Sequence, residues 1–128
     1  MKRFALMLVM VLVAIGLSSM STKKASARLQ YKNRFDEATK NSKAVELIKE
    51  HKCNVCHHTS DKKKRNDFGQ AVNKHMDKET FEKLKSDKKK LDEKIDEAIK
   101  AAFKEKSPEG KTFGELIEAG QLPAKIVK

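Results

Sequence analysis

The sequence predicts an all-α fold built from four to five short helices. Apolar residues recur at spacings of three and four in several segments, which is the period of an amphipathic helix. No segment of convincing length alternates apolar and polar residues, as a half-buried strand would. Residues that favour helix N-termini precede several of the periodic segments. The length of 128 residues corresponds to one ordinary domain.

The N-terminal segment, residues 1–27, is predicted to be a secretory signal peptide. A short basic stretch precedes an uncharged apolar run over residues 4–17, which is shorter than the roughly 20 residues of a membrane-spanning helix. Residues 25–27 read Ala-Ser-Ala, a cleavage pattern, so we expect cleavage after Ala27. An uncleaved anchor is the alternative, because the segment before the cleavage pattern is long and carries two lysines. We expect a mature domain over residues 28–128, in the periplasm or an equivalent extracytoplasmic compartment, with no stable membrane span.

The periodic segments place the helices along the mature chain. The expected elements are a helix over 42–51, a short helix over 67–76, a further turn over 80–84, the strongest helix over 87–105, and a short helix after Thr112. Ser42, Asp67 and Ser86 are the expected starting residues of the first three helices. Thr112 and Glu115 fit a capping box, and Gly120 can end that last helix. Residues 28–40 are polar and predict an irregular or partly helical lead-in.

The chain is strongly basic. Lys and Arg number 29 against 18 Asp and Glu, a formal charge of +11, which excludes an acidic disordered chain. Basic runs occur at residues 62–65 and 88–90, and a charge run is most often a solvated surface. The functional interpretation is a positive surface that steers an acidic redox partner. Nucleic-acid binding fits neither export nor the shortage of aromatic residues, with no Trp and one Tyr.

The motif Cys53-Asn54-Val55-Cys56-His57 carries the functional prediction. Cys-x-x-Cys-His is the attachment signal for c-type haem. Each thiol can add across one haem vinyl group, and the adjacent histidine can supply its imidazole as the proximal iron ligand. The sequence therefore predicts one covalent haem c, held by Cys53, Cys56 and His57 and surrounded by the helices.

Three other uses of the two cysteines are alternatives to haem attachment. A plain disulfide or a redox-active dithiol needs the same spacing, but the dithiol motif is expected beside a βαβ pattern, which the sequence lacks. A zinc site would need a second spaced pair of ligands. His51 or His58 could contribute one ligand, but no second pair is present.

The sequence does not decide which residue is the distal iron ligand. The sequence has no methionine or histidine after Met76, so the candidates in the mature chain are His51, His58, His75, Met76 or a lysine. His51 and His58 lie close to the motif, whereas His75 and Met76 are far enough from it for a loop to pass round the haem edge. Met76 could equally be a core residue, and His75 a solvated residue at a helix end. A five-coordinate iron or a ligand from a partner are the remaining alternatives.

The chain resembles small monohaem c-type cytochromes, loosely of class I, and more particularly a group of small basic planctomycete cytochromes. The resemblance rests on CNVCH, on the following KKKRNDFGQAV and on KTFGELIEAGQLP, and it covers most of residues 44–123. It implies an exported haem protein for electron transfer. A subset of anammox-type heterodimeric cytochromes binds small gases and uses a cysteine as distal ligand. Here both cysteines belong to the attachment motif, so none is left for the iron.

Two functions follow as hypotheses. The first is a carrier of single electrons between redox proteins, whose partner has an acidic docking face. The alternative is a haem protein or sensor that binds NO or CO through an open or labile distal site, in a homodimer or heterodimer. We expect no enzymatic turnover, because no convincing general base or nucleophile constellation occurs in the sequence.

Overall fold

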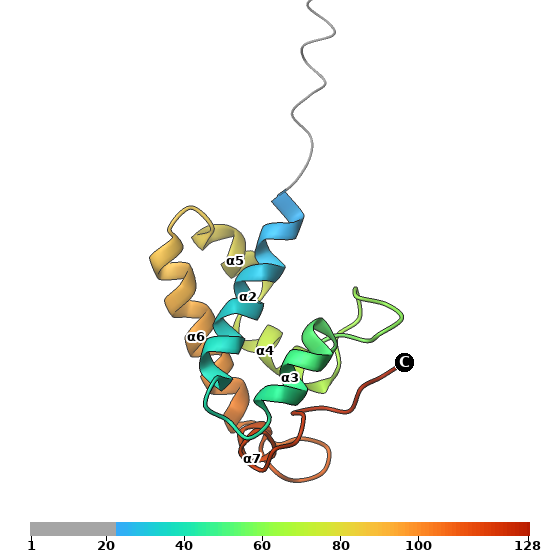
Figure 1. The fold of residues 1–128 in the computed structure, drawn as a ribbon. Helices are drawn as coiled ribbons and strands as arrows, with labels where there is room; N and C mark the ends of the chain where they lie inside the picture. The colour runs from blue at the N-terminus through green and yellow to red at the C-terminus, as the bar shows by residue number, and fades with distance from the viewer. Residues whose placement is uncertain (1–22) are drawn as a thin grey trace, which may run out of the picture.

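The described part of the chain consists of helices joined by loops. A computed structural model describes residues 23–128, with side chains from Leu29 onward, and the apolar run of the predicted signal peptide lies outside it (Figure 1). The helices are α2 (Lys23–Thr39), α3 (Val45–His51), the 3₁₀ helix η1 (Lys52–Val55), α4 (Asp67–His75), α5 (Lys78–Leu84), α6 (Lys88–Lys104) and α7 (Phe113–Glu118). Between residues 23 and 128, β-pairing is limited to two isolated bridges. The all-α prediction is confirmed, and the residues from Lys23 onward form six α-helices where four or five were predicted.

None of the helices in the described region is both long and apolar enough to cross a membrane. The predicted cleavage site after Ala27 falls within the backbone of α2, which begins at Lys23. The cleavage itself stays a prediction.

Helix α2 is the main departure from the expected structure. The polar segment 28–40 was expected to be irregular or partly helical, but its backbone is helical to Thr39. The helix is held by α6. Arg34 forms a double hydrogen bond with the Asp96 carboxylate, and its Nε lies 2.7 Å from Asp96 Oδ1. Gln30 donates to Asp92 at 3.1 Å, and Phe35 is buried in the core.

The helix starts follow the predicted pattern with small shifts. Asp77 and Asp87 accept hydrogen bonds from backbone amides at the starts of α5 and α6, so Asp87 takes the place expected for Ser86. Thr112 and Glu115 form the predicted capping box of α7. Ser42 does not cap α3, because that helix begins only at Val45, and the buried Ser42 hydroxyl has no hydrogen-bond partner in the described structure.

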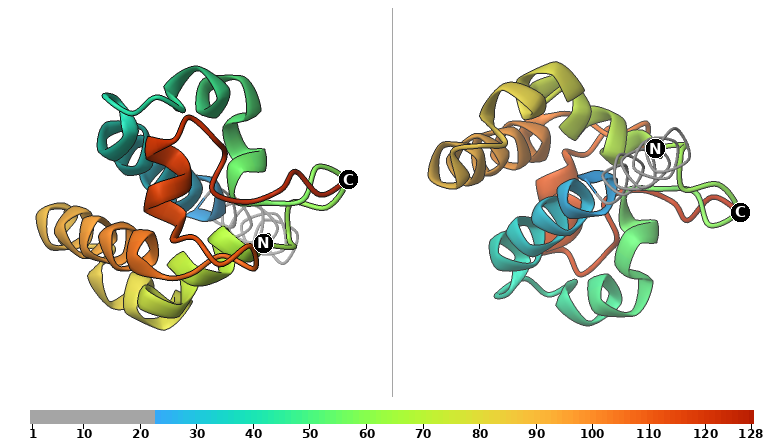
Figure 2. Two further views of the ribbon diagram at one scale, coloured as in Figure 1. Left: turned by 90° about the horizontal axis from the view of Figure 1, so that it is seen from below. Right: turned by 90° about the horizontal axis from the view of Figure 1, so that it is seen from above.

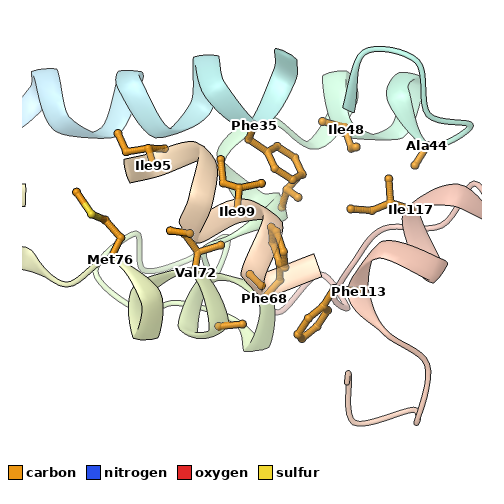
Figure 3. Close-up of a cluster of buried hydrophobic side chains, with 14 of the residues drawn as sticks. Phe35, Ala44, Ile48, Phe68, Val72, Met76, Ile95, Ile99, Phe113 and Ile117 are labelled. Carbon is orange, nitrogen blue, oxygen red and sulfur yellow. The ribbon is translucent and has the colours of Figure 1, made fainter. Parts of the chain in front are cut away.

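Helix α6 is the centre of the packing. It contacts α2, α4, α5 and α7, and α7 closes the lower end of the molecule (Figures 1 and 2). Four phenylalanine rings meet in the middle of the core, with the fully buried Phe68 among Phe35, Phe103 and Phe113 at centroid distances of 5.4, 5.9 and 5.3 Å. Figure 3 shows Phe35, Phe68 and Phe113 of this group. The core therefore joins α2, α4, α6 and α7 into a support for the segment that carries the two cysteines.

Candidate functional site: the Cys-x-x-Cys-His segment

The cysteine segment follows directly on α3 as a single tight turn. The amides of Cys56 and His57 both donate to the carbonyl of Cys53, at 3.3 and 3.1 Å. Val55, in the middle of the turn, is 1% exposed and anchors it to the core. Cys53 is exposed and Cys56 is half-buried, and both are free thiols. The turn thus brings two thiols and an imidazole to one short stretch of the surface.

Lys52, immediately before Cys53, has a strained backbone. Its φ of +48° and ψ of −116° lie in a region that suits glycine and disfavours residues with a Cβ atom. Its amide nevertheless donates to the Ile48 carbonyl and ends α3. This bend turns the chain from α3 into the cysteine turn.

Replacing Lys52 by glycine is expected to raise the free energy of unfolding by about 1 kcal/mol, because glycine adopts this backbone without strain. Chemical denaturation of the two proteins measures the difference. Lys49→Gly, within the regular part of α3, is the control and should lower stability by about 1 kcal/mol. Destabilisation by both changes would contradict the assignment of strain to Lys52.

The loop after the motif folds back on it and orients His57. The His58 amide donates to the Lys64 carbonyl at 3.2 Å, and the Asn66 amide donates to the Cys56 carbonyl at 3.0 Å. His57 Nδ1 also lies 3.2 Å from the Lys64 carbonyl oxygen. A carbonyl can only accept, so Nδ1 carries the proton and the lone pair of the neutral ring is on Nε2. Histidines that bind metal through Nε2 are oriented in this way.

Asn66 connects the motif to α4. Its side-chain oxygen accepts from the Gly69 amide at 3.0 Å and caps α4, a role that the sequence assigned to Asp67. Its side-chain nitrogen donates to the Val55 carbonyl at 2.9 Å. An asparagine is as good a cap as an aspartate, and only asparagine can also donate to the motif. The start of α4 and the cysteine turn are therefore held by one buried amide.

Asn66→Asp is expected to keep the cap but lose the bond to Val55, placing a carboxylate beside a backbone carbonyl. We expect a loss of about 1–3 kcal/mol in unfolding free energy, measured by urea denaturation. The reverse exchange, Asp77→Asn at the exposed start of α5, should change stability by only a few tenths of a kcal/mol. Equal effects at both positions would show that the amide donor of Asn66 does not contribute to the free energy of unfolding.

Gly69 lets α4 approach the motif closely. A Cβ atom built on Gly69 would lie 2.2 Å from the Cys56 carbonyl oxygen, well inside van der Waals contact. That oxygen also accepts from the Asn66 amide. Only a residue without a side chain allows this packing, and the sequence reasoning did not single out Gly69.

The environment of Cys56 differs from that of a reactive thiol. Burial and, to a smaller extent, the neighbouring Cys53 raise the pKa of the Cys56 thiol to about 12, although the Arg65 guanidinium opposes both effects. Nucleophilic thiols in redox-active pairs have lowered pKa values instead. Cys56 is therefore a poor nucleophile at neutral pH.

The two candidate distal ligands are adjacent in sequence but face different surroundings. Met76 is 2% exposed, and its side chain lies in the core beside Val72 and Ile95 (Figure 3). Its carbonyl accepts from the Tyr31 hydroxyl at 3.3 Å. His75 is half-buried, and its Nε2 lies 2.5 Å from the Glu105 carboxylate after α6. Lys74 and His75 hold the pKa of the Glu105 carboxyl below its usual range.

Two surface pockets lie away from the motif. One of about 430 Å³ runs between α3, α7 and the C-terminal segment, and one of about 540 Å³ includes Lys74 and Glu105. Neither is lined by Cys53, Cys56 or His57. Within the part of the chain that the structure describes, no group of three or more His, Cys, Asp or Glu side chains could hold a bare metal ion.

Comparison with known proteins gives no relative. The chain matches no family model, no curated protein and no solved structure.

Proposed function

We propose that the protein is an exported monohaem cytochrome c that carries single electrons between redox partners. Cys53 and Cys56 would hold haem c through two thioether bonds, and His57 would be the proximal iron ligand. The observation that supports this most is the hydrogen bond from His57 Nδ1 to the Lys64 carbonyl, since it puts the ring lone pair on Nε2. The haem iron would supply the ferric–ferrous couple.

The residues around the motif have defined tasks in this proposal. The Lys64 carbonyl fixes the orientation of the imidazole and increases its basicity as a ligand. Val55 and Asn66 hold the turn against the core, so that the two thiols keep their spacing. A fixed site of this kind limits reorganisation when the charge of the iron changes.

The surroundings of the two candidate distal ligands, Met76 and His75, support a second candidate function. The Met76 side chain would have to leave the core to reach an iron, and His75 would have to leave Glu105. Either rearrangement has a free-energy cost, which supports a weak or missing sixth ligand. A haem with an open distal position would bind CO or NO, so the gas-binding function remains the alternative proposal.

Covalent attachment is tested by purifying the protein from a host that matures c-type cytochromes and denaturing it. Haem should remain bound to the wild-type chain and be lost from the Cys53→Ala/Cys56→Ala double variant, whereas each single variant should keep one link. His57→Ala should alter the absorption spectrum, and His58→Ala, at the next residue, should leave it unchanged. Two intact links in either single variant, or no haem in the wild type, would overturn the proposal.

Absorption spectra of the reduced protein with and without CO separate the two functions. An unchanged six-coordinate spectrum supports the electron carrier, and Met76→Ala compared with His75→Ala then identifies the ligand. If Met76 is that ligand, its loss should lower the reduction potential, because a thioether raises it. Ready binding of CO to the wild type supports gas binding.

A further inference from the structure

The segment that follows α7 crosses the molecule to the loop that orients His57. Helix α7 ends at Glu118, and Gly120, with a φ of +83°, provides the left-handed backbone at which the chain turns away from the helix. Residues 121–128 then run without helix or strand to the loop between α3 and α4 (Figures 1 and 2). We call residues 121–128 the strap, because they join two parts of the molecule that are far apart in the sequence.

The strap is anchored at its beginning and borders a pocket before it reaches the loop. The side chain of Pro123 is fully buried, and Lys125 Nζ lies 3.2 Å from the Glu109 carboxylate. The pocket of about 430 Å³ described above separates the strap from α3, and its lining includes Ile126 and Leu47. Detaching the end of the strap therefore exposes less apolar surface than detaching packed core residues would.

Thr59 and Val127 form the contact between the strap and the loop. The amide and the hydroxyl of Thr59 both donate to the Val127 carbonyl, at 2.8 and 3.1 Å. The two residues are 68 positions apart in the chain. The hydrogen bonds described above from the amides of His58 and Asn66 join residues within 53–66, so they shape the loop from inside. The contact with Val127 instead fixes the loop to the C-terminal segment.

Thr59 is directly connected to the hydrogen bonds that orient His57. The amide of His58, the residue before Thr59, donates to the Lys64 carbonyl at 3.2 Å, and the same carbonyl oxygen lies 3.2 Å from His57 Nδ1. Consecutive residues are joined by planar peptide groups, so a displacement of Thr59 also displaces His58. The position of the strap therefore affects the hydrogen bond at His57 Nδ1.

We propose that the strap holds the loop in the position at which Lys64 orients His57, so that Thr59 and Val127 are positioning residues for the proposed iron ligand. The proposal rests on the proposed function, since it concerns the regulation of the same site. With the strap in place, His57 Nδ1 donates to the Lys64 carbonyl and the lone pair stays on Nε2. With the strap released, this hydrogen bond weakens and the imidazole becomes a less basic ligand.

The first test compares two shortened chains. A chain that ends at Lys125 stops two residues short of the contact, about 7 Å in an extended segment. A chain that ends at Val127 is the matched control, because its terminal carboxylate still accepts both hydrogen bonds from Thr59. The readout is the exchange of the His57 Nδ1 proton with water, followed by ¹⁵N NMR of the reduced protein. We expect exchange about tenfold faster or more in the first chain, and within about twofold of the wild-type rate in the control.

Thr59→Val tests the same contact in the full-length chain. Valine has a similar shape and keeps the amide but lacks the hydroxyl, so we expect the His57 Nδ1 proton to exchange about fivefold faster. Ser60→Ala is the control, because the exposed Ser60 hydroxyl makes no hydrogen bond among the described residues. Far-UV circular dichroism checks that the helices are retained. Equal exchange rates in the two shortened chains, or in Thr59→Val and Ser60→Ala, would overturn the role of the strap.

The haem content of the same samples keeps this proposal distinguishable from the electron-carrier function. Faster exchange in the chain that ends at Lys125, in a protein that contains no haem, would support the strap and overturn the electron carrier. Full haem content with equal exchange in both shortened chains would overturn the strap and support the electron carrier. In haem-containing protein the chain that ends at Lys125 should also have a higher reduction potential than its control, because a less basic ligand stabilises ferric iron less.

Discussion

Gly69→Ala is expected to lower the free energy of unfolding by about 3 kcal/mol or more. In an ordinary helix interior the same change raises stability by about 1 kcal/mol, because alanine is the better helix former. Here the new Cβ would lie 2.2 Å from the Cys56 carbonyl oxygen. This oxygen belongs to the backbone, so it cannot rotate away as a flexible side chain could. Relief requires α4 to move from the motif, which also breaks the hydrogen bond from the Asn66 amide to Cys56. Thermal or urea denaturation measures the loss.

Gly114→Ala is the matched control for Gly69→Ala. Gly114 lies in the first turn of α7, and its Cβ would meet the Phe103 carbonyl oxygen at 3.1 Å, a contact that a small shift can relieve. We expect a change within about 1 kcal/mol at this position. A similarly small effect at Gly69 would mean that α4 does not need its close contact with the motif.

Phe68→Ala is expected to lower the free energy of unfolding by about 3–5 kcal/mol. The Phe68 side chain is fully buried and touches three other phenylalanine rings, from α2, the end of α6 and the start of α7. Truncation leaves a cavity where four helices meet, and the rings around it cannot all move inward together. The variant should also hold the motif less firmly, because Phe68 is next to Gly69 in α4.

Phe81→Ala, in α5, is the control for Phe68→Ala. Phe81 is half-buried and stacks on Tyr31 alone, with ring centroids 6.0 Å apart. Solvent already reaches its site, so truncation should cost about 1–2 kcal/mol. Comparable losses from the two variants, measured by the same denaturation, would contradict the central position of Phe68 in the core.

The elements that the sequence predicted well are those defined by neighbouring residues. Helix α6 has an apolar stripe and an aspartate before its first residue, and α7 has a complete capping box, so both could be located from local pattern. Helix α2 has almost no such pattern. Its largest contact is with α6, including Arg34 with Asp96, 62 residues further along the chain. No local property of residues 28–40 contains that information.

The candidate site likewise contains some residues that the local sequence predicts and others that it does not. The spacing of Cys53, Cys56 and His57 predicts a function because the chemistry depends on side-chain identity. The orientation of His57 depends on a backbone carbonyl, and every residue has one, so Lys64 could not be recognised in advance. The roles of Gly69 and Asn66 were also not predicted from the sequence. For Asn66 a signal was present, because an asparagine lies directly before the predicted start of the helix.

The pairing of α2 with α6 also has a consequence for the order in which the chain is completed. Translation proceeds from the N-terminus, so Cys53 and Cys56 emerge before Asp92 and Asp96, the partners of α2. During that interval the core cannot close around the turn. Cys56, half-buried in the finished fold, is then as accessible as Cys53. Under the proposed function, an enzyme that attaches the haem to both thiols would have its best access to them on the growing chain.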